Sequence, residues 1–352
     1  MTRYKNILCF TAAAALLVGC DGTSTAPLLP GEEPVEVFLT ARIARTDVTV
    51  TTTKAGDFIE NGETFPDQAA IGVYGLRDQN DPFQGAHLEN TCFTAGTTAE
   101  GTDNAVALEG PRIYFPSGTD RFYLYGYYPY TGSPTYAEDG AASIGVCSSL
   151  IDAVDRQGCA TDPLYTGATE TLKNTIEPTD DGQDYQSVLP VTQNLNFRHA
   201  LARLQLTVKL TEETPQAQTA PTLQSIRLTF AHSQRGQMNV ADGTVTPETN
   251  DEATVQEITG LTTALTTTGY LADHTVLPAE DGIQKIEIQV DDQWFTAYER
   301  TYNDAIALTA GTVTNVVVTY NPSVSTTGNI TDWNEDGSTH EYPAVTPTDS
   351  EP

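Results

Sequence analysis

Cysteine offers the most versatile side-chain chemistry in this chain, and its five positions fall into two groups. Cys9 and Cys20 lie close to the start, whereas Cys92, Cys147 and Cys159 lie further along. Cys147 and Cys159 bracket a loop of about a dozen residues and could form a disulfide in an oxidising compartment, leaving Cys92 over. The other disulfide pairings are also possible, and the alternative is that all three cysteines are buried thiols. None of the three follows C-x-x-C spacing, so redox and zinc chemistry have no support.

Histidines and carboxylates give no sign of a catalytic or metal site. His199 has no His, Cys or carboxylate at ligand spacing, so we expect a hydrogen-bonded structural residue there. The other histidines are scattered along the chain: His87, His232, His274 and His340. We find no G-x-S-x-G elbow, P-loop, H-E-x-x-H or glycine-rich dinucleotide turn. The sequence therefore favours a protein that is not an enzyme and needs no cofactor, although a dispersed pair among its 47 acids would leave no motif.

Two acidic clusters, at residues 180–184 and 332–336, could offer oxygen ligands to calcium. Neither places the glycine and the terminal glutamate where an EF-hand requires them. We interpret both clusters as solvated turns and predict no metal site.

The N-terminus predicts export and lipidation. Arg3 and Lys5 precede an apolar run over residues 7–18, too short for a permanent membrane span. The run ends in Leu-Val-Gly-Cys at Cys20, which resembles the bacterial lipobox, whose cysteine thiol carries a diacylglycerol. The alternative is an ordinary secretory peptide with an incidental cysteine. We assign residues 1–19 to the signal peptide and the Pro-containing residues 20–34 to a tether.

Composition narrows the class of protein further. The chain has 352 residues, 17 Lys+Arg against 47 Asp+Glu, a formal net charge of −30 and a pI near 4.2. Such an acidic surface repels phosphate backbones and anionic headgroups, which excludes nucleic acid as an expected partner. No segment after the leader has some 18 consecutive apolar residues, so lipid on Cys20 would be the only membrane attachment.

The elements that must position these residues are strands. After residue 34, apolar residues recur with period two in short segments separated by Gly, Asp, Asn and Pro. We predict an all-β fold with strands at 35–39, 70–74, 113–115, 204–208, 226–230, 286–290 and 313–318.

The segment 211–221 has no aromatic residue and no apolar periodicity, and we place a domain boundary there. The predicted domains are β-sandwiches at residues 35–211 and 222–341. A disordered tail is expected at residues 342–352.

Several segments, in their order along the chain, resemble the fimbrillin and fimbrillin-like family of Bacteroidetes. They are 69–74 (AAIGVY), 111–116 (PRIYFP), 122–130 (FYLYGYYPY), 195–204 (LNFRHALARL) and 330–334 (ITDWN). The resemblance covers nearly the whole mature chain. It implies two sandwich domains of transthyretin-like topology, lipoprotein export to the cell surface at the outer membrane, and assembly into fimbriae with other subunits by donated strands.

The resemblance also implies a maturation site. In the family, a protease that cuts after arginine in the loop following the first strand removes that strand and leaves a groove for an incoming subunit. Arg42 and Arg45 are the candidates here, because they follow the first expected strand. Removing that strand would expose backbone groups and the pockets that hold Val35, Val37 and Leu39. The alternative is that both arginines are solvated charges at a strand end.

The tyrosine-rich strand at 122–130 allows two interpretations. Phe122 and Leu124 point to one face and Tyr123 and Tyr125 to the other, which favours burial on both sides. The alternative is a platform on which exposed tyrosines stack against sugars. The leading hypothesis is therefore a structural and adhesive fimbrial subunit that contacts a host or bacterial surface ligand. The alternative is a monomeric glycan-binding surface lipoprotein.

Replacing Cys20 by alanine is expected to leave a soluble or inner-membrane-stalled precursor, because the lipid chains at this residue would supply essentially all of the membrane affinity. Metabolic labelling with a fatty acid measures the effect. Equal label in the variant and the parent would contradict the lipobox interpretation.

Overall fold

The computed structural model describes residues 34–44, 59, 63–98, 104–173, 190–211, 220–248, 253–302 and 305–321, with the backbone alone of 329–333 and 339–342. Apart from a 3-10 turn at Arg300–Tyr302, all regular secondary structure in these residues is β. The predicted all-β class is confirmed, and every strand segment named above overlaps a strand.

The N-terminal half is built on one nine-stranded sheet around an apolar core. Its strands are β1 (Glu36–Ile43), β2 (Ala70–Leu76), β3 (Leu88–Thr98), β4 (Val106–Glu109), β5 (Ile113–Tyr114), β6 (Arg121–Tyr128), β9 (Leu164–Tyr165), β10 (Thr169–Leu172) and β11 (Val191–His199). The order is β10-β6-β2-β3-β4-β1-β11-β9, and β5 pairs with β1. Because β9 also pairs with β6, strand pairing runs around the core without a break, where two separate sheets were expected.

The C-terminal half packs two sheets around a second core. One holds β12 (Ala202–Leu210), β18 (Tyr270–Val276), β22 (Val313–Tyr320), β23 (Asn329–Trp333) and β24 (Thr339–Tyr342). The other holds β13 (Thr222–Phe230), β16 (Thr254–Ile258), β17 (Thr263–Ala264), β19 (Ala279–Val290), β20 (Gln293–Glu299) and β21 (Ile306–Leu308). Alternate residues of β12 and β13, such as Leu206 and Leu228, are buried in the shared core, as the period-two pattern requires.

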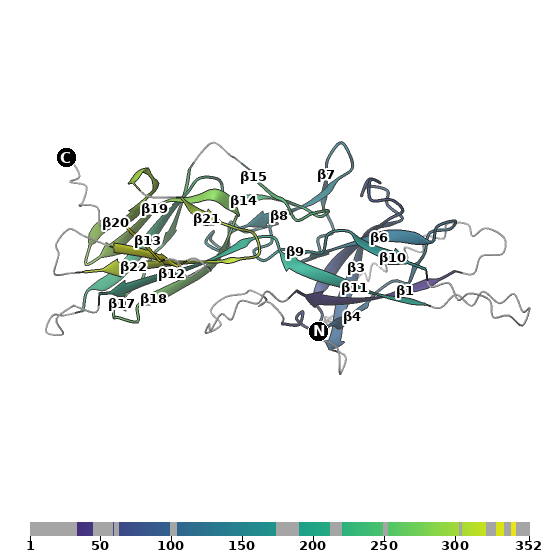
Figure 1. Cartoon of the computed structure of the whole chain (residues 1–352), viewed down its shortest axis with the longest axis horizontal. Helices are drawn as coiled ribbons and strands as arrows, with labels where there is room; N and C mark the ends of the chain where they lie inside the picture. Colours follow the sequence, from purple (N-terminus) through teal and green to yellow (C-terminus); the bar gives the residue numbers. More distant parts are fainter. Residues whose placement is uncertain are drawn as a thin grey trace, which may run out of the picture.

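A third, four-stranded sheet joins the halves. It is formed by β7 (Thr135–Tyr136), β8 (Ala142–Cys147), β14 (Arg235–Asn239) and β15 (Val245–Pro247), and β8 pairs with β14 across the junction. Figure 1 shows β8 and β14 between the two groups of strands. The adjoining hydrophobic cluster takes residues from both halves, including Tyr74 and Met238.

The strand pairing corrects the expected domain boundary. Residues 35–211 were assigned to the first domain, but β12 pairs with β18 and β22 and so belongs to the C-terminal sheets. The chain crosses between the halves at Ala200 and Leu201, which are both buried. The polar segment 211–221 instead connects β12 to β13, from one sheet of the C-terminal half to the other. Loss of apolar periodicity marks a linker between domains and a loop between two sheets of one domain alike, so the sequence could not distinguish them.

The segments that carry the family resemblance pack against one another through glycines. A Cβ atom at Gly72 would lie 2.1 Å from the ring of Tyr127, its register partner on β6. A Cβ at Gly126 would lie 2.7 Å from the ring of Phe197 on β11. Each glycine therefore leaves the space that an aromatic ring of another motif fills.

The segment 195–204, the fourth of these motifs, also forms the joint between the halves. Phe197 lies in the N-terminal core and Leu204 in the C-terminal core. Between them, Arg203 forms a bidentate ion pair with the buried Asp273 of β18, with Nε–Oδ1 and Nη2–Oδ2 distances of 2.8 and 2.6 Å. One stretch of sequence thus links both cores.

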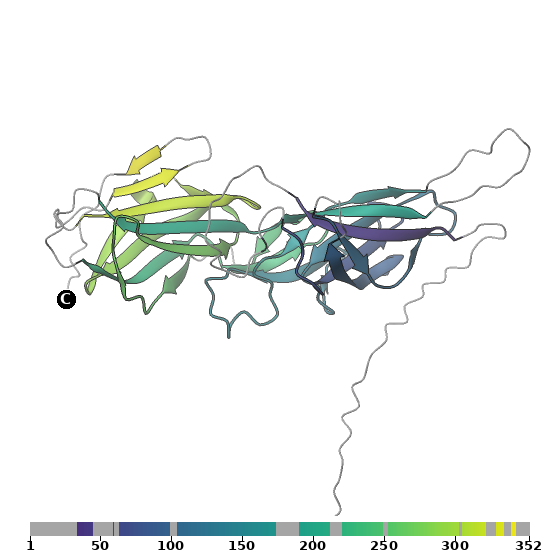
Figure 2. The same cartoon turned by 90° about the horizontal axis from the view of Figure 1, so that it is seen from below.

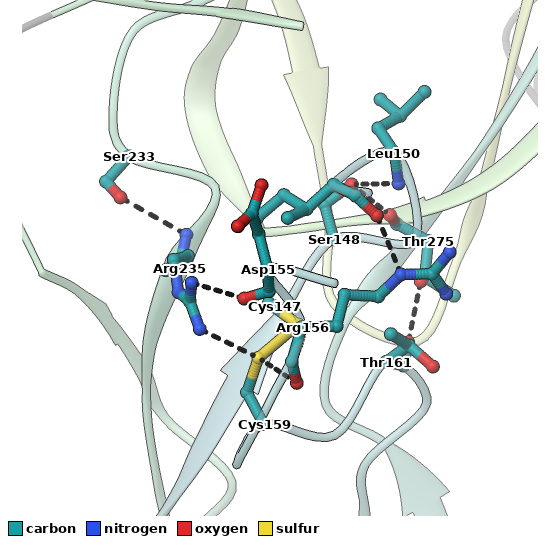
Figure 3. The surroundings of a disulfide bond; sticks show 11 residues. Cys147, Ser148, Leu150, Asp155, Arg156, Cys159, Thr161, Ser233, Arg235 and Thr275 are labelled. Carbon is teal, nitrogen blue, oxygen red and sulfur yellow. Dashed lines mark hydrogen bonds between the residues drawn. A yellow bond between two sulfur atoms is a disulfide. The ribbon is translucent and has the colours of Figure 1, made fainter. Parts of the chain in front are cut away.

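Cys147 and Cys159 form a disulfide with a Cα–Cα distance of 5.7 Å (Figure 3). The loop that it closes docks on the C-terminal half. Ser148 donates a hydrogen bond from Oγ to the carbonyl of Thr275 at 2.7 Å, and Arg235 donates to the carbonyl of Asp155 at 2.6 Å. The disulfide therefore fixes a loop that contacts both β14 and β18.

Replacing Gly72 by alanine is expected to lower the free energy of unfolding by about 2 kcal/mol or more, because the methyl group overlaps the ring of Tyr127. Gly132→Ala is the matched control, since the nearest atom to its Cβ is 3.9 Å away. Calorimetric melting of both variants measures the difference. Equal melting temperatures would show that β2 and β6 can separate without cost.

The double variant Cys147→Ser, Cys159→Ser is expected to lose about 3 kcal/mol of stability, the loop-closure value for a ring of this length. Cys92→Ser, on β3 and outside the disulfide, serves as the control. Thermal melting with and without reductant reports the effect. A parent protein whose melting is insensitive to reductant, although its disulfide is reduced, would refute a stabilising role.

Candidate strand-exchange site

The first strand lies in the middle of the N-terminal sheet rather than at an edge. β1 runs parallel to β11, from the pair Val37 and Val191 to the pair Ile43 and Phe197. Its other side pairs antiparallel with β4 and β5. Figure 2 shows β1, in purple, running beside β11. Because both of its edges are occupied, β1 is held by hydrogen bonds along most of its length.

One face of β1 contributes every second side chain to the core. Together with Val35, which immediately precedes the strand, these inward side chains are between 0 and 4% exposed: Val35, Val37, Leu39, Ala41 and Ile43. All belong to the same hydrophobic cluster as Leu195 and Phe197 of β11. The three residues predicted to fill the groove are therefore buried, and the row extends two residues further than the sequence analysis placed it.

The outward face of β1 carries polar contacts to its neighbours. Thr40 donates from Oγ1 to Oδ1 of Asn194 at 3.4 Å, and Arg42 donates from Nε to Oδ1 of Asn196. Glu36 forms an exposed ion pair with Arg112 at 3.6 Å. These contacts add little energy, but they depend on the register between β1 and its neighbours.

The position expected for Arg42 was wrong. It was placed in a loop after the first strand, but β1 continues to Ile43 and Arg42 lies within it. The strand continues because Ala41 and Ile43 extend the buried alternation, and the amide of Ala44 still donates to the carbonyl of Phe197 at 2.8 Å. Arg45 is the next residue and lies outside the described residues, as do Cys20 and residues 174–189 with their acidic cluster.

The tyrosine-rich strand is part of the core, as the first interpretation held. Tyr125 and Tyr127 of β6 are 4% and 0% exposed. The hydroxyl of Tyr127 donates to Asn90 Oδ1 at 2.5 Å and lies 3.0 Å from the carbonyl of Thr131. Burial raises the pKa of Tyr127 far above its usual value, so the hydroxyl stays a neutral donor. Tyr125 and Tyr127 are therefore too buried to stack on a sugar, whereas Tyr123 is partly exposed.

His199 is a hydrogen-bonded structural residue, as predicted. Its Nδ1 lies 2.6 Å from Oδ1 of Asp162, whose Oδ2 accepts the amide of Ile59 at 2.9 Å. Asp162 was not identified from the sequence because it lies 37 residues away and no local pattern connects it to the histidine. Within the described part of the chain, no three His, Cys, Asp or Glu residues gather in a way that could hold a metal ion.

None of the helical segments in the described residues has the length and apolar character needed to cross a membrane.

Sequence reasoning missed Ala41, Ile43, Asn194 and Asn196 as members of the site. The inward pair could have been found by following the alternation past Leu39, whereas the asparagines become neighbours only through the parallel pairing of β1 and β11.

Comparisons with known proteins give a consistent result. A search of the curated proteins found no match. Among solved structures, a candidate cell adhesion protein from Bacteroides uniformis is similar, with a TM-score of 0.52 and 19% identity over 88% of this chain and 98% of that one. A candidate cell adhesion protein from Bacteroides ovatus has a TM-score of 0.47 and 16% identity, over 91% and 100% of the two chains.

The fimbrial anchor protein Mfa2 from Porphyromonas gingivalis has a TM-score of 0.38 and 10% identity, over 88% and 99% of the two chains. The Bacteroides uniformis protein, with a TM-score of 0.52 and 19% identity, supports the fold alone. The fimbrillin-like family model matches residues 51–333. The chain therefore belongs to the fimbrillin-like family.

Proposed function

We propose that this protein is a structural and adhesive subunit of cell-surface fimbriae, exported as a lipoprotein precursor and assembled by strand exchange. Membership of the fimbrillin-like family supports the fimbrial role and a location at the cell surface. The partners would be other fimbrial subunits and a surface ligand. The lipid on Cys20 would hold the precursor at the outer membrane. In this proposal the protein has no catalytic role and needs no cofactor.

The observation that carries this proposal is the central position of β1 with its row of buried side chains. β1 is the first strand of the described chain, so a single cut after it would sever its covalent link to the rest of the sheet. A central strand leaves two rows of unpaired backbone groups when it departs, one on β11 and one on β4 and β5. Only another strand satisfies both rows.

The energy available to an incoming strand is large. Val37, Leu39 and Ile43, together with Val35, fill core positions, and burying such a side chain contributes about 1.5–3 kcal/mol. For these four side chains the burial free energy adds up to roughly 6–12 kcal/mol, before subtracting the entropy cost of ordering the incoming strand. A groove emptied of β1 would therefore bind a matching strand strongly and would associate with other chains until it is filled.

Of the two arginines, Arg45 fits the cut better. Arg42 lies within β1, is the register partner of Asn196 on β11 and donates a hydrogen bond to its side chain, so its peptide bond is held in the sheet. Proteases cleave extended, accessible chain, so a cut at Arg42 requires local opening of the sheet. A cut after Arg45 would separate the whole of β1, including Ile43, from the mature chain.

An arginine-specific protease is expected to convert the full chain to a form that begins at Thr46, and only this form should assemble into ladders resistant to mild detergent. Arg45→Ala should block both steps, because it removes the arginine that the protease would recognise, while Arg42 is held within β1. N-terminal sequencing identifies the cut, and gel analysis measures assembly.

Arg42→Ala is the matched control and should be processed and assemble like the parent. If Arg45→Ala polymerises as well as the parent, removal of β1 by cleavage is wrong, and the fold and family assignment are unaffected. Processing lost in Arg42→Ala but kept in Arg45→Ala would move the site to Arg42.

A further inference from the structure

The inward row of β1 contains one small residue among large ones. Ala41 is 0% exposed, and its two register partners are Leu195 on β11 and Val106 on β4. Both partners are themselves buried members of the same cluster. The position of Ala41, called here the Ala41 slot, is therefore a place in the core where the surrounding side chains leave room for a methyl group.

Such a slot has a consequence for register. Because side chains alternate between faces, a shift of one residue would turn the apolar row of β1 to the solvent. A shift of two residues keeps the alternation and would otherwise be tolerated. It would, however, carry Leu39 or Ile43 into the Ala41 slot, where a branched side chain meets packed neighbours.

The outward contacts agree with the same register. Thr40 and Arg42 flank Ala41 in sequence and donate to Asn194 and Asn196, which flank Leu195. A shift of two residues would leave one asparagine opposite Phe38 or Ala44, neither of which has a side-chain donor. The slot and the two asparagines thus select one alignment of a strand that runs parallel to β11.

We propose that the Ala41 slot determines which strand of another subunit can replace β1. The incoming strand would run parallel to β11 and present inward residues in the order large, large, large, small, large, with the small residue in the slot. This inference rests on the proposed strand exchange and specifies the partner that the emptied site accepts.

The inference can be tested on the full chain with a site for a sequence-specific protease inserted after Arg45. After cleavage, the severed β1 segment is exchanged for labelled peptides, and binding is followed by fluorescence anisotropy. The peptides are residues 35–44, a variant with Ala41→Leu, and a variant with Leu39→Ala and Ala41→Leu together. The last has the same composition as the native peptide and differs only in where the small residue lies.

The native peptide is expected to bind, and both peptides with leucine in the slot should bind about tenfold more weakly or worse, the scale of an overpacked core position. A peptide with Phe38→Ser is the outward control. Phe38 is 50% exposed, so this peptide should bind within about twofold of the native one.

Equal binding of the native and both leucine-in-slot peptides would overturn the role of the slot while leaving strand exchange in place. Failure of every peptide, the native one included, would overturn both the slot and the strand exchange on which it rests. Binding of the native and Phe38→Ser peptides with loss of the other two would support the proposal.

Discussion

The fold of the N-terminal half depends on the pairing of β1 with β11 and with β4 and β5. This strand contributes a row of buried side chains and satisfies the backbone groups of both neighbours. Because β9 pairs with both β6 and β11, strand pairing is continuous around the core. β1 is therefore an internal strand of this sheet and not an edge strand. A strand so placed is costly to lose, because its departure exposes apolar side-chain positions and leaves backbone groups unpaired on both neighbours.

The two halves are joined by packing as well as by the chain. The shared sheet of β8 and β14, the disulfide loop on β18 and the ion pair of Arg203 with Asp273 all lie at or next to the crossover at Ala200 and Leu201. The same region holds a hydrophobic cluster drawn from both halves. The two halves are therefore held together by a shared sheet, a disulfide-closed loop and an ion pair as well as by the chain itself.

Much of this arrangement could be predicted from residue patterns. The alternation of apolar residues predicted the strands and the all-β class, and the aromatic residues at 122–130 favoured a strand buried on both faces. The domain boundary could not be predicted, because the polar segment 211–221 reads as a linker whether it joins domains or sheets. The end of β1 was missed because the polar residues Thr40 and Arg42 suggested that the strand had ended. They lie on its solvent face, and the inward residues Ala41 and Ile43 continue the apolar row.

The sequence by itself determined the strand-forming segments and the inward faces, because these depend on local spacing of side chains along the chain. It also carries the motifs through which the chain resembles its family. The tertiary structure alone decided that β1 is central, that Arg42 faces Asn196, that Asp162 supports His199 and that Ala41 lies between Leu195 and Val106. Those relations join residues that are far apart in the sequence. They exist only once strand order and register are fixed, and the packing of the whole core fixes both.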